Sequence, residues 1–460
     1  MPRKTIATFA NQRKETARHS WQFKPRFRRG AFGWKSQPAI SRIGQAVAEI
    51  RKAAKTDPVV AAEGAVVFLE RVSPAIEHVD SSSGAIGSCV NRAIDELAPL
   101  IAKAPADMKT RDRWLERVFD AYLSDEIPYL ERLGEVWGEV CGAKEVASMW
   151  ADRLLEVART ALEPERGPGG YSKVTSACLS AMYCAGKFDE LIGLLRSEGF
   201  WHYRKWMVRA MAAKGLVDDA IRMAESSRGR YSSDAEIDWT CEEILLAASR
   251  ADEAYAGYGV RANQGATYLA TFRAVAKKYP RKTPKEIILD LARSTPGEEG
   301  KWFAAAKDAG LYAEALGLAR QSPCEPRTLT RAARDFAGKQ PAFAVGSGLL
   351  AMHWLVRGYG YEITGADVWA AYGATMAAAA RHGSAAETKE RIRQMLTAET
   401  GSGQFVAKIL GQELALQPAA SHEQVDAADP RSSAQRVGFL PLDQRRKPTD
   451  HPEFLKLYPQ

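Results

Sequence analysis

A motif that recurs along the middle of the chain constrains the fold more than any other feature. In four segments an apolar helical stretch leads to a small residue, and an acidic start to the next helix follows. The small residues are Gly186, Gly215, Ser249 and Gly310. They lie 29, 34 and 61 positions apart, and the last interval is close to two units of about 30. We therefore predict a helix–turn–helix repeat.

Each part of this motif has a physical role in a helical hairpin. The small residue allows a left-handed turn between two antiparallel helices, and the acid is stabilised at the N-terminus of the second helix. The period is close to that of tetratricopeptide repeats, although their full signature is not kept. Such repeats stack into a solenoid whose concave surface is available to a partner.

Apolar spacing and helix caps extend this prediction to the chain from about residue 38 onward. Asp57-Pro58 is a typical helix start, and Thr283 with Glu286 and Thr295 with Glu298 fit the capping box. The predicted fold is all-α, an α-solenoid of antiparallel helix pairs that is tetratricopeptide- and HEAT-like. Two sets of apolar residues have the spacing that places them on one face of a helix. The first is Ile86, Val90, Ile94, Leu97 and Ile101, and the second is Val146, Trp150, Leu154, Val157 and Ala161.

Composition divides the chain into four parts. We predict a basic, aromatic N-terminal arm over 1–35, a HEAT-like helical region over 36–165 and tetratricopeptide-like repeats over 171–416. The stretch Arg-Gly-Pro-Gly-Gly at 166–170 is the predicted boundary between the two helical regions. Residues 417–460 contain several prolines and no sustained apolar period, so we predict an irregular tail that is extended or disordered.

The positive charge of the chain is concentrated in the arm. Residues 1–35 hold ten Lys and Arg against Glu15 alone, a net charge of +9, whereas the other 425 residues sum to −1. Five aromatic residues alternate with cations over 21–35, a composition that suits stacking on exposed bases and contact with phosphates. The alternative is that the aromatic side chains fold back and cap the end of the solenoid. The residues predicted to contact a partner are Trp21, Lys24, Arg26, Phe27, Arg28, Arg29 and Trp34.

A second cluster of tryptophan and cations lies near residue 200. Helical spacing places His202, Trp206 and Arg209 on one side of a helix, where an arginine beside tryptophan can stack on bases or bind a carboxylate. The alternative is packing between repeats, with the arginine extending outward. The cations of 277–285 could contact phosphate or belong to a solvated loop. The predicted contact residues of the second cluster are Trp201, Arg204, Lys205, Trp206 and Arg209.

The sequence contains none of the common catalytic motifs. There is no phosphate-binding G-x-x-x-x-G-K-[ST], no H-E-x-x-H and no G-x-S-x-G. The seven histidines are scattered, and acidic pairs such as Asp218-Asp219 are explained by their place at helix starts. We therefore predict no catalytic residue, metal or cofactor.

Cysteine usage and hydropathy bear on the compartment. The six cysteines include no C-x-x-C pair and indicate buried thiols in a reducing environment. No apolar run reaches the ~20 residues that a membrane helix needs. We expect a cytoplasmic protein that does not bind membranes.

Three stretches resemble a family of uncharacterised bacterial α-helical repeat proteins. They are GEEGKWFAAAKDAG at 297–310, GYGYEIT at 358–364, and VSPA at 72–75 ahead of VDSSSG at 79–84. Some members are joined to SWIM-type zinc fingers, whose Cys-x-Cys and Cys-x-His pairs this chain lacks. The resemblance implies a helical-repeat fold in a bacterial cytoplasm and no catalytic residue.

These observations support three hypotheses about function. The first is a non-catalytic scaffold that binds a protein partner, with an arm that contacts nucleic acid or an acidic protein. The second is a nucleic-acid-binding protein of a defence or mobile-element system, in which Arg204, Lys205 and Arg209 line a basic groove. The third is an enzyme similar to the HEAT-like DNA glycosylases, because WMVRA at 206–210 resembles their Trp-Val-Arg-Arg-Ala helix. It requires an Asp or Glu beside tryptophan in a concave pocket.

Overall fold

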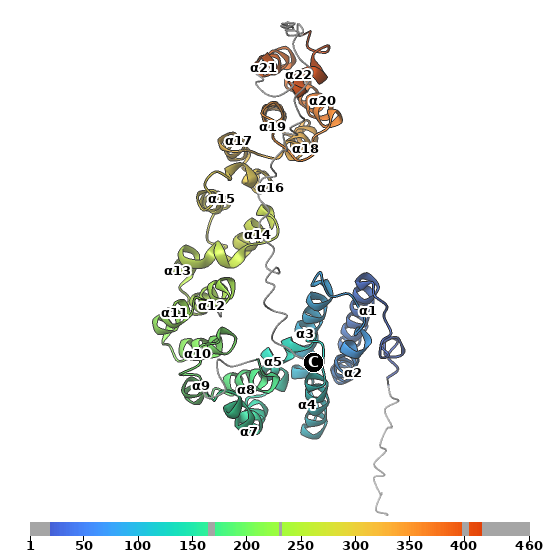
Figure 1. Cartoon of the computed structure of the whole chain (residues 1–460), viewed down its shortest axis with the longest axis vertical. Coiled ribbons are helices and arrows are strands. Elements are labelled where there is room, and N and C mark those ends of the chain that lie inside the picture. The colour runs from blue at the N-terminus through green and yellow to red at the C-terminus, as the bar shows by residue number, and fades with distance from the viewer. Residues whose placement is uncertain (1–18, 164–170, 230–231, 398–403, 416–460) are drawn as a thin grey trace, which may run out of the picture.

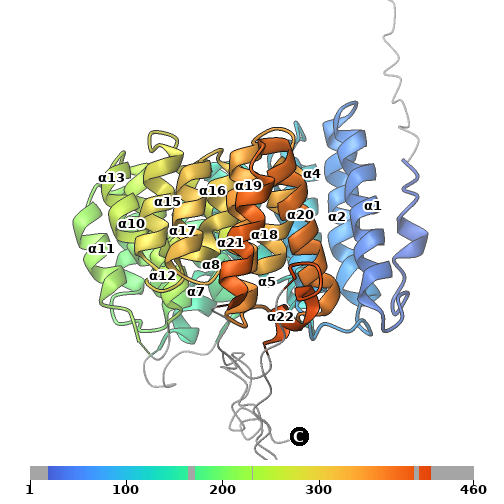
Figure 2. The ribbon, with the colours of Figure 1, turned by 90° about the horizontal axis from the view of Figure 1, so that it is seen from above.

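The computed structural model describes residues 19–163, 171–229, 232–397 and 404–415. Within these ranges all regular structure is helical and no strand is formed. Neighbouring helices pack side by side, and the array curves into a C (Figure 1). The helix axes run in nearly the same direction along the array (Figure 2). The predicted all-α solenoid is confirmed.

The N-terminal region combines long helices with two helices of about one turn. Asp57 caps α2 by accepting hydrogen bonds from the amides of Val59 and Val60, as the sequence predicts. Pro58 follows at the first helical position, where no amide hydrogen is needed. The helices are α1 (Ser36–Ala54), α2 (Pro58–Ala75), α3 (Ala85–Lys103), α4 (Met108–Leu123), α5 (Glu131–Glu135), α6 (Trp137–Cys141) and α7 (Lys144–Ala161).

The two predicted apolar faces have different outcomes. In α3 all five predicted residues are buried. In α7 the prediction is wrong for Val157, whose exposed fraction is 54%. The buried face of α7 instead continues through Ala147, Ala151 and Ala158, small residues that allow close packing on the next helix.

Five helical hairpins form the middle of the array. Their first helices lie on the inner side of the C and their second helices on the outer side (Figure 1). The inner helices are α8 (Lys173–Cys184), α10 (Trp201–Ala213), α12 (Asp234–Ala247), α14 (Tyr268–Lys278) and α16 (Phe303–Asp308). The outer helices are α9 (Phe188–Leu194), α11 (Val217–Glu225), α13 (Ala251–Ala254), α15 (Pro284–Arg293) and α17 (Tyr312–Gln321).

The repeated small residues take the predicted left-handed conformation. The φ angles are 71° at Gly186, 86° at Gly215, 74° at Gly310 and 62° at Ser249. The hairpin of α14 and α15 fills the interval of 61 residues. Its turn begins at Tyr279 and lacks the motif, so the repeat was visible in only four of five hairpins.

The acids after each turn link one repeat to the next. Lys214, beside the second turn, pairs with Asp189 of the preceding hairpin. Arg250 pairs in the same way with Asp218, with Nη1 2.6 Å from the carboxylate oxygen. The acidic pairs are therefore structural as well as favourable for the helix dipole.

The two predicted capping boxes also differ in outcome. Thr283 and Glu286 form both hydrogen bonds of the box at the start of α15. Thr295 starts no helix, because it follows the end of α15 and donates its hydroxyl to the carbonyl of Leu291. That prediction is wrong, since the same sequence pattern occurs at a helix end.

The C-terminal part of the array continues the alternation of inner and outer helices. Helix α19 packs on both α18 and α20, and α21 packs on α19 and α20. The helices are α18 (Pro326–Phe336), α19 (Pro341–Val356), α20 (Gly365–His382), α21 (Ala385–Thr397) and α22 (Phe405–Leu410).

Helix α10 joins two hydrophobic cores. One core extends from Trp21 to Ala210, and the other from Trp201 to Leu414. The predicted boundary at 166–170 lies outside the described residues. On either side of it, α7 and α8 pack closely together. The predicted division into two helical regions stays a prediction. The predicted tail at 417–460 also lies outside the described residues.

Candidate functional site

The described part of the arm folds back onto the first helices. Trp21, Phe23 and Phe27 are buried in the first core, and the ring of Phe27 lies 5.5 Å from that of Phe68 between centroids. Gly64 makes room for Trp21, because a Cβ atom there would lie 2.2 Å from the indole. The placement fits the capping interpretation. It does not fit the prediction that Trp21 and Phe27 contact a partner, since buried rings cannot stack on bases.

Hydrogen bonds from backbone amides hold the rest of the cap against α1 and α2. The amide of Gly30 donates to the carbonyl of Pro74 at 2.9 Å, and the amide of Gln22 donates to the carboxylate of Glu49 at 2.8 Å. Five predicted contact residues stay on the surface: Lys24, Arg26, Arg28, Arg29 and Trp34. The exposed fraction of Trp34 is 72%. Residues 1–18 of the predicted arm lie outside the described residues.

The predicted cluster on α10 divides between packing and surface. Trp201 is buried in the second core, and Arg204 donates to the sulfur of Met223 at 2.8 Å, so these two residues hold repeats together. Lys205, Trp206 and Arg209 instead line a pocket. The packing interpretation therefore holds for Trp201 and Arg204, whereas the other three residues form part of a groove.

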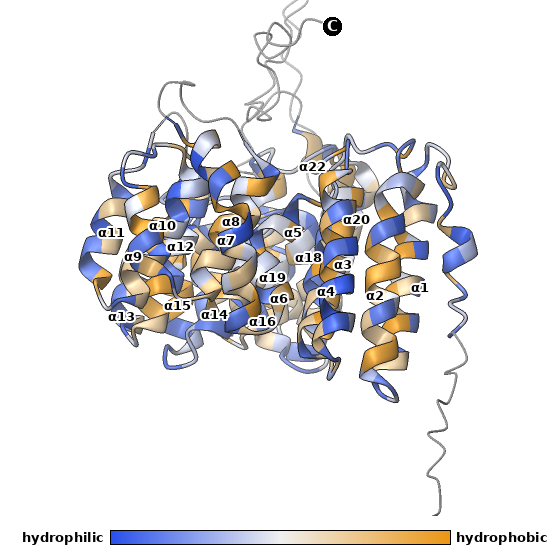
Figure 3. Ribbon diagram, turned by 90° about the horizontal axis from the view of Figure 1, so that it is seen from below, coloured by the Kyte–Doolittle hydropathy of each residue, from blue (hydrophilic) through white to orange (hydrophobic). Residues whose placement is uncertain are grey.

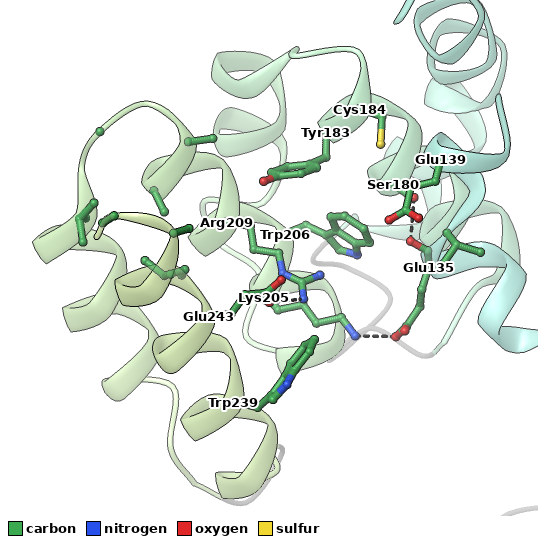
Figure 4. A pocket seen from close by; sticks show the side chains of 18 of the residues that line it. Glu135, Glu139, Ser180, Tyr183, Cys184, Lys205, Trp206, Arg209, Trp239 and Glu243 are labelled. Carbon is green, nitrogen blue, oxygen red and sulfur yellow. Dashed lines mark hydrogen bonds and ion pairs between the residues drawn. The ribbon is translucent and has the colours of Figure 1, made fainter. Parts of the chain in front are cut away.

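The pocket lies on the inner side of the C, where α5, α6, α8, α10 and α12 converge. It has a volume of about 670 Å³ and is called the inner groove below. Figure 4 shows the side chains that face one another across it. The residues that line it include Glu135, Glu139, Ser180, Tyr183, Lys205, Trp206, Arg209, Trp239 and Glu243.

One wall of the inner groove is a buried ion pair. The Nζ atom of Lys205 lies 2.5 Å from Glu135 Oε1, and Arg132 Nη1 lies 2.7 Å from Glu135 Oε2. Burial alone would raise the pKa of Glu135, but Lys205 and then Arg132 outweigh it and lower that pKa to about 2. Glu135 is therefore ionised near neutral pH and is a poor proton carrier there.

The opposite wall holds an arginine between two tryptophans. The guanidinium carbon of Arg209 lies 5.4 Å from the Trp206 ring centroid and 5.5 Å from that of Trp239. Arg209 Nη2 also pairs with Glu243 at 3.0 Å. Trp206 is buried, whereas 45% of Trp239 is exposed. The groove thus offers a held cation and an open aromatic ring.

Trp239 and Glu243 were not predicted as site residues. Trp239 lies 33 residues after Trp206, which is one repeat, and Glu243 follows one helical turn later. Comparison of equivalent positions in successive repeats would have found Trp239. The pairing of Glu243 with Arg209 depends on how adjacent inner helices are set against each other.

The second predicted basic cluster does not join this surface. Lys278 Nζ pairs with Glu242 at 2.5 Å, Lys285 Nζ pairs with Glu314 at 2.7 Å, and Lys282 lies over the ring of Tyr255. Arg273 pairs with Asp308. Most cations of 273–285 are thus engaged within the fold, and none of them lines the inner groove.

The thiols and the potential metal ligands in the described part of the chain do not form a reactive site. All six cysteines are free thiols, and burial raises the pKa of Cys141, Cys178 and Cys324 to about 12. Across the described ranges, no three His, Cys, Asp or Glu side chains gather as a metal site would require. No helix there is both long enough and apolar enough to cross a bilayer.

His202 makes the region beneath the groove sensitive to pH. Burial, followed by the charge of Lys205, lowers the pKa of His202 from 6.5 to about 4. The unfolded chain therefore binds the proton more readily, and the free energy of unfolding falls as the pH falls from about 6.5 toward 4. Urea unfolding at pH 7 and pH 5 should show this loss, and it should be smaller in His202→Gln. Equal pH dependence in the two proteins would show that His202 does not cause the loss.

Comparison of the sequence with models of known families and with curated proteins gave no match. The resemblance to bacterial helical-repeat proteins therefore stays a prediction.

Proposed function

We propose that the protein is a non-catalytic helical-repeat scaffold that binds a short segment of a partner protein in the inner groove. The observation that carries the proposal is Arg209, held between Trp206 and Trp239 on the concave side where two cores meet. Binding sites favour such concave junctions. A groove of about 670 Å³ accommodates a few side chains rather than a folded domain.

The lining specifies the chemistry of the bound segment. Arg209 can exchange its surface-exposed partner Glu243, whose side chain is half exposed, for a carboxylate of the segment. Trp239 presents its ring next to that position for an apolar or aromatic side chain. Lys205 is buried against Glu135 and stays with it. We therefore expect an acidic residue next to an apolar one in the partner.

The charge of the groove disfavours nucleic acid as its ligand. Its three cations are balanced by three carboxylates, so it does not concentrate positive charge where phosphates would bind. The second hypothesis placed Arg204, Lys205 and Arg209 in a basic groove. Arg204 lies outside the lining, and the other two are paired with acids.

A glycosylase remains a second candidate because of one feature. The third hypothesis required an acid beside tryptophan in a concave pocket, and Glu243 lines the groove with Trp206 and Trp239. Binding is favoured over catalysis for two reasons. Glu243 forms an ion pair with Arg209, and Glu135, whose pKa is lowered to about 2, is ionised near neutral pH and a poor proton carrier there. Release of free base from alkylated duplex DNA, abolished by Glu243→Gln, would replace the scaffold proposal with this one.

Selection from a random peptide library, followed by affinity measurement, tests the scaffold proposal. Peptides selected on the full chain should pair an acid with an apolar residue. Arg209→Gln and Trp239→Ala should each weaken them by tenfold or more, because truncated anchor residues cost about 1–3 kcal/mol. Trp369→Ala is the matched control, since its ring is 46% exposed on α20 and lies outside the groove. Equal binding by Arg209→Gln, Trp239→Ala and the control would refute the proposal.

A further inference from the structure

The N-terminal end of the described array carries an excess of positive charge. Residues 19–55 hold nine Lys and Arg against Glu49 alone, a net charge of +8. This equals the formal charge of the whole 460-residue chain. The short η1 turn (Lys24–Arg26) is hydrophilic and lies beyond α1, at the end of the array (Figure 3).

The fold of the cap separates the aromatic rings from the cations. Trp21, Phe23 and Phe27 point into the core, whereas Lys24, Arg26 and Arg28 between and after them are exposed. The rings thus anchor a segment whose outer side is basic. A cap needs only the rings, so the density of outward cations has no structural explanation.

Helix α1 adds cations to the same surface. Arg42, Glu49 and Lys52 lie at i, i+7 and i+10, which places them on one face of the helix. Glu49 accepts hydrogen bonds from the amides of Gln22 and Phe23, so this face of α1 adjoins the cap. Both cations of this face are exposed.

Most of these cations have no acidic partner. Within the described residues, Arg29 pairs with Glu77 and Arg51 with Glu96. No ion pair in the described structure involves the other seven cations. Five of the seven lie on the cap or on the face of α1 that adjoins it. They are Lys24, Arg26, Arg28, Arg42 and Lys52, and we call them the basic end face.

We infer that the basic end face binds the phosphate backbone of nucleic acid. This goes beyond the proposed function, because the end face and the inner groove share no residue. Since the rings of Trp21 and Phe27 are buried, binding rests on charge and does not read bases. Duplex and single strands of any sequence therefore bind.

An anionic membrane is a less suitable partner. Attachment to a bilayer uses apolar side chains that enter the interface together with the cations. The apolar residues of α1, such as Ile43 and Ile50, are buried in the core, as are the rings of the cap apart from the partly buried Phe32 and the exposed Trp34. One exposed ring gives little insertion.

Fluorescence anisotropy of the full chain with a 20-base-pair duplex and a 20-nucleotide single strand tests the inference. About five phosphate contacts predict that duplex affinity falls about 10²- to 10³-fold between 50 and 200 mM salt. Replacing Lys24, Arg26 and Arg28 together by glutamine should lower affinity at least tenfold and make the salt dependence less steep. Circular dichroism should show unchanged helix content, because these side chains are exposed.

A matched control removes the same charge elsewhere. Replacing Lys277, Lys339 and Arg393 by glutamine should change affinity less than twofold, since these exposed cations also lack an acidic partner in the described structure but lie far along the chain. Equal losses in the two triple variants would overturn the inference, as would binding that the first variant leaves intact. A strong preference for single strands, or binding to phosphatidylserine vesicles and not to nucleic acid, would also overturn it.

Discussion

Replacing Phe27 by alanine should destabilise the N-terminal end of the array by about 3–5 kcal/mol. The ring is buried and contacts Phe23, Phe32 and Phe68, so its loss leaves a cavity between the cap and α2. Because each unit of a solenoid contacts only its neighbours, the loss should stay local. The expected result is loosening of the cap, α1 and α2 with no change in α19 or α20.

Amide hydrogen exchange measures this difference along one chain. Protection in α1 and α2 should fall by about two to four orders of magnitude in Phe27→Ala, which corresponds to about 3–5 kcal/mol. Trp34→Ala is the control. It removes a larger ring from the same segment, but the Trp34 side chain is 72% exposed. Equal effects of the two substitutions would mean that the cap does not depend on buried rings.

Replacing Glu242 by alanine should lower stability by about 3–5 kcal/mol, because it leaves buried polar groups without their acceptor. The side chain has an exposed fraction of 0%. Its carboxylate accepts from Lys278 Nζ at 2.5 Å, from the Tyr279 hydroxyl at 2.6 Å and from Asn263 Nδ2 at 2.6 Å. This cluster connects α12 to α14, where the repeat lacks its usual turn.

The neighbouring residue provides the control for this prediction. Glu243→Ala removes the same group one position later, from an ion pair in which the glutamate is 51% exposed, and should cost less than about 1 kcal/mol. Urea unfolding monitored by circular dichroism compares the two variants with the parent chain. A loss below 1 kcal/mol in Glu242→Ala would contradict the role given to the buried cluster.

The repeat was predictable because its causes are local. A left-handed turn needs a small residue and a helix start favours an acid, so both appear in the sequence at the period of the fold. Gly186, Gly215 and Gly310 confirm that reasoning, and Ser249 shows the same conformation in another small residue. The capping prediction at Thr295 failed because a short pattern does not distinguish a helix start from a helix end.

The orientation of the arm was not predictable, because its cause is non-local. Alternating rings and cations suit either a nucleic-acid contact or a cap, and the sequence left both open. Gly64, more than forty residues after Trp21, provides the space that admits the indole to the core.

Only part of the lining of the inner groove was predicted, for a similar reason. Arg209 was found on its own helix, but Glu243 and Trp239 belong to the next repeat.

The internal ion pairs of the inner groove have a consequence for which partners it rejects. Glu135 is paired with Lys205 and Glu243 with Arg209, so these charges of the groove are paired within the protein. A wholly apolar segment would exclude water from Arg209 and Glu243 and offer nothing in return, which costs free energy. A segment with a carboxylate replaces one partner of Arg209 by another and releases Glu243 to solvent. Under the proposed function, we therefore expect the groove to select partners as much by the segments it disfavours as by those it attracts.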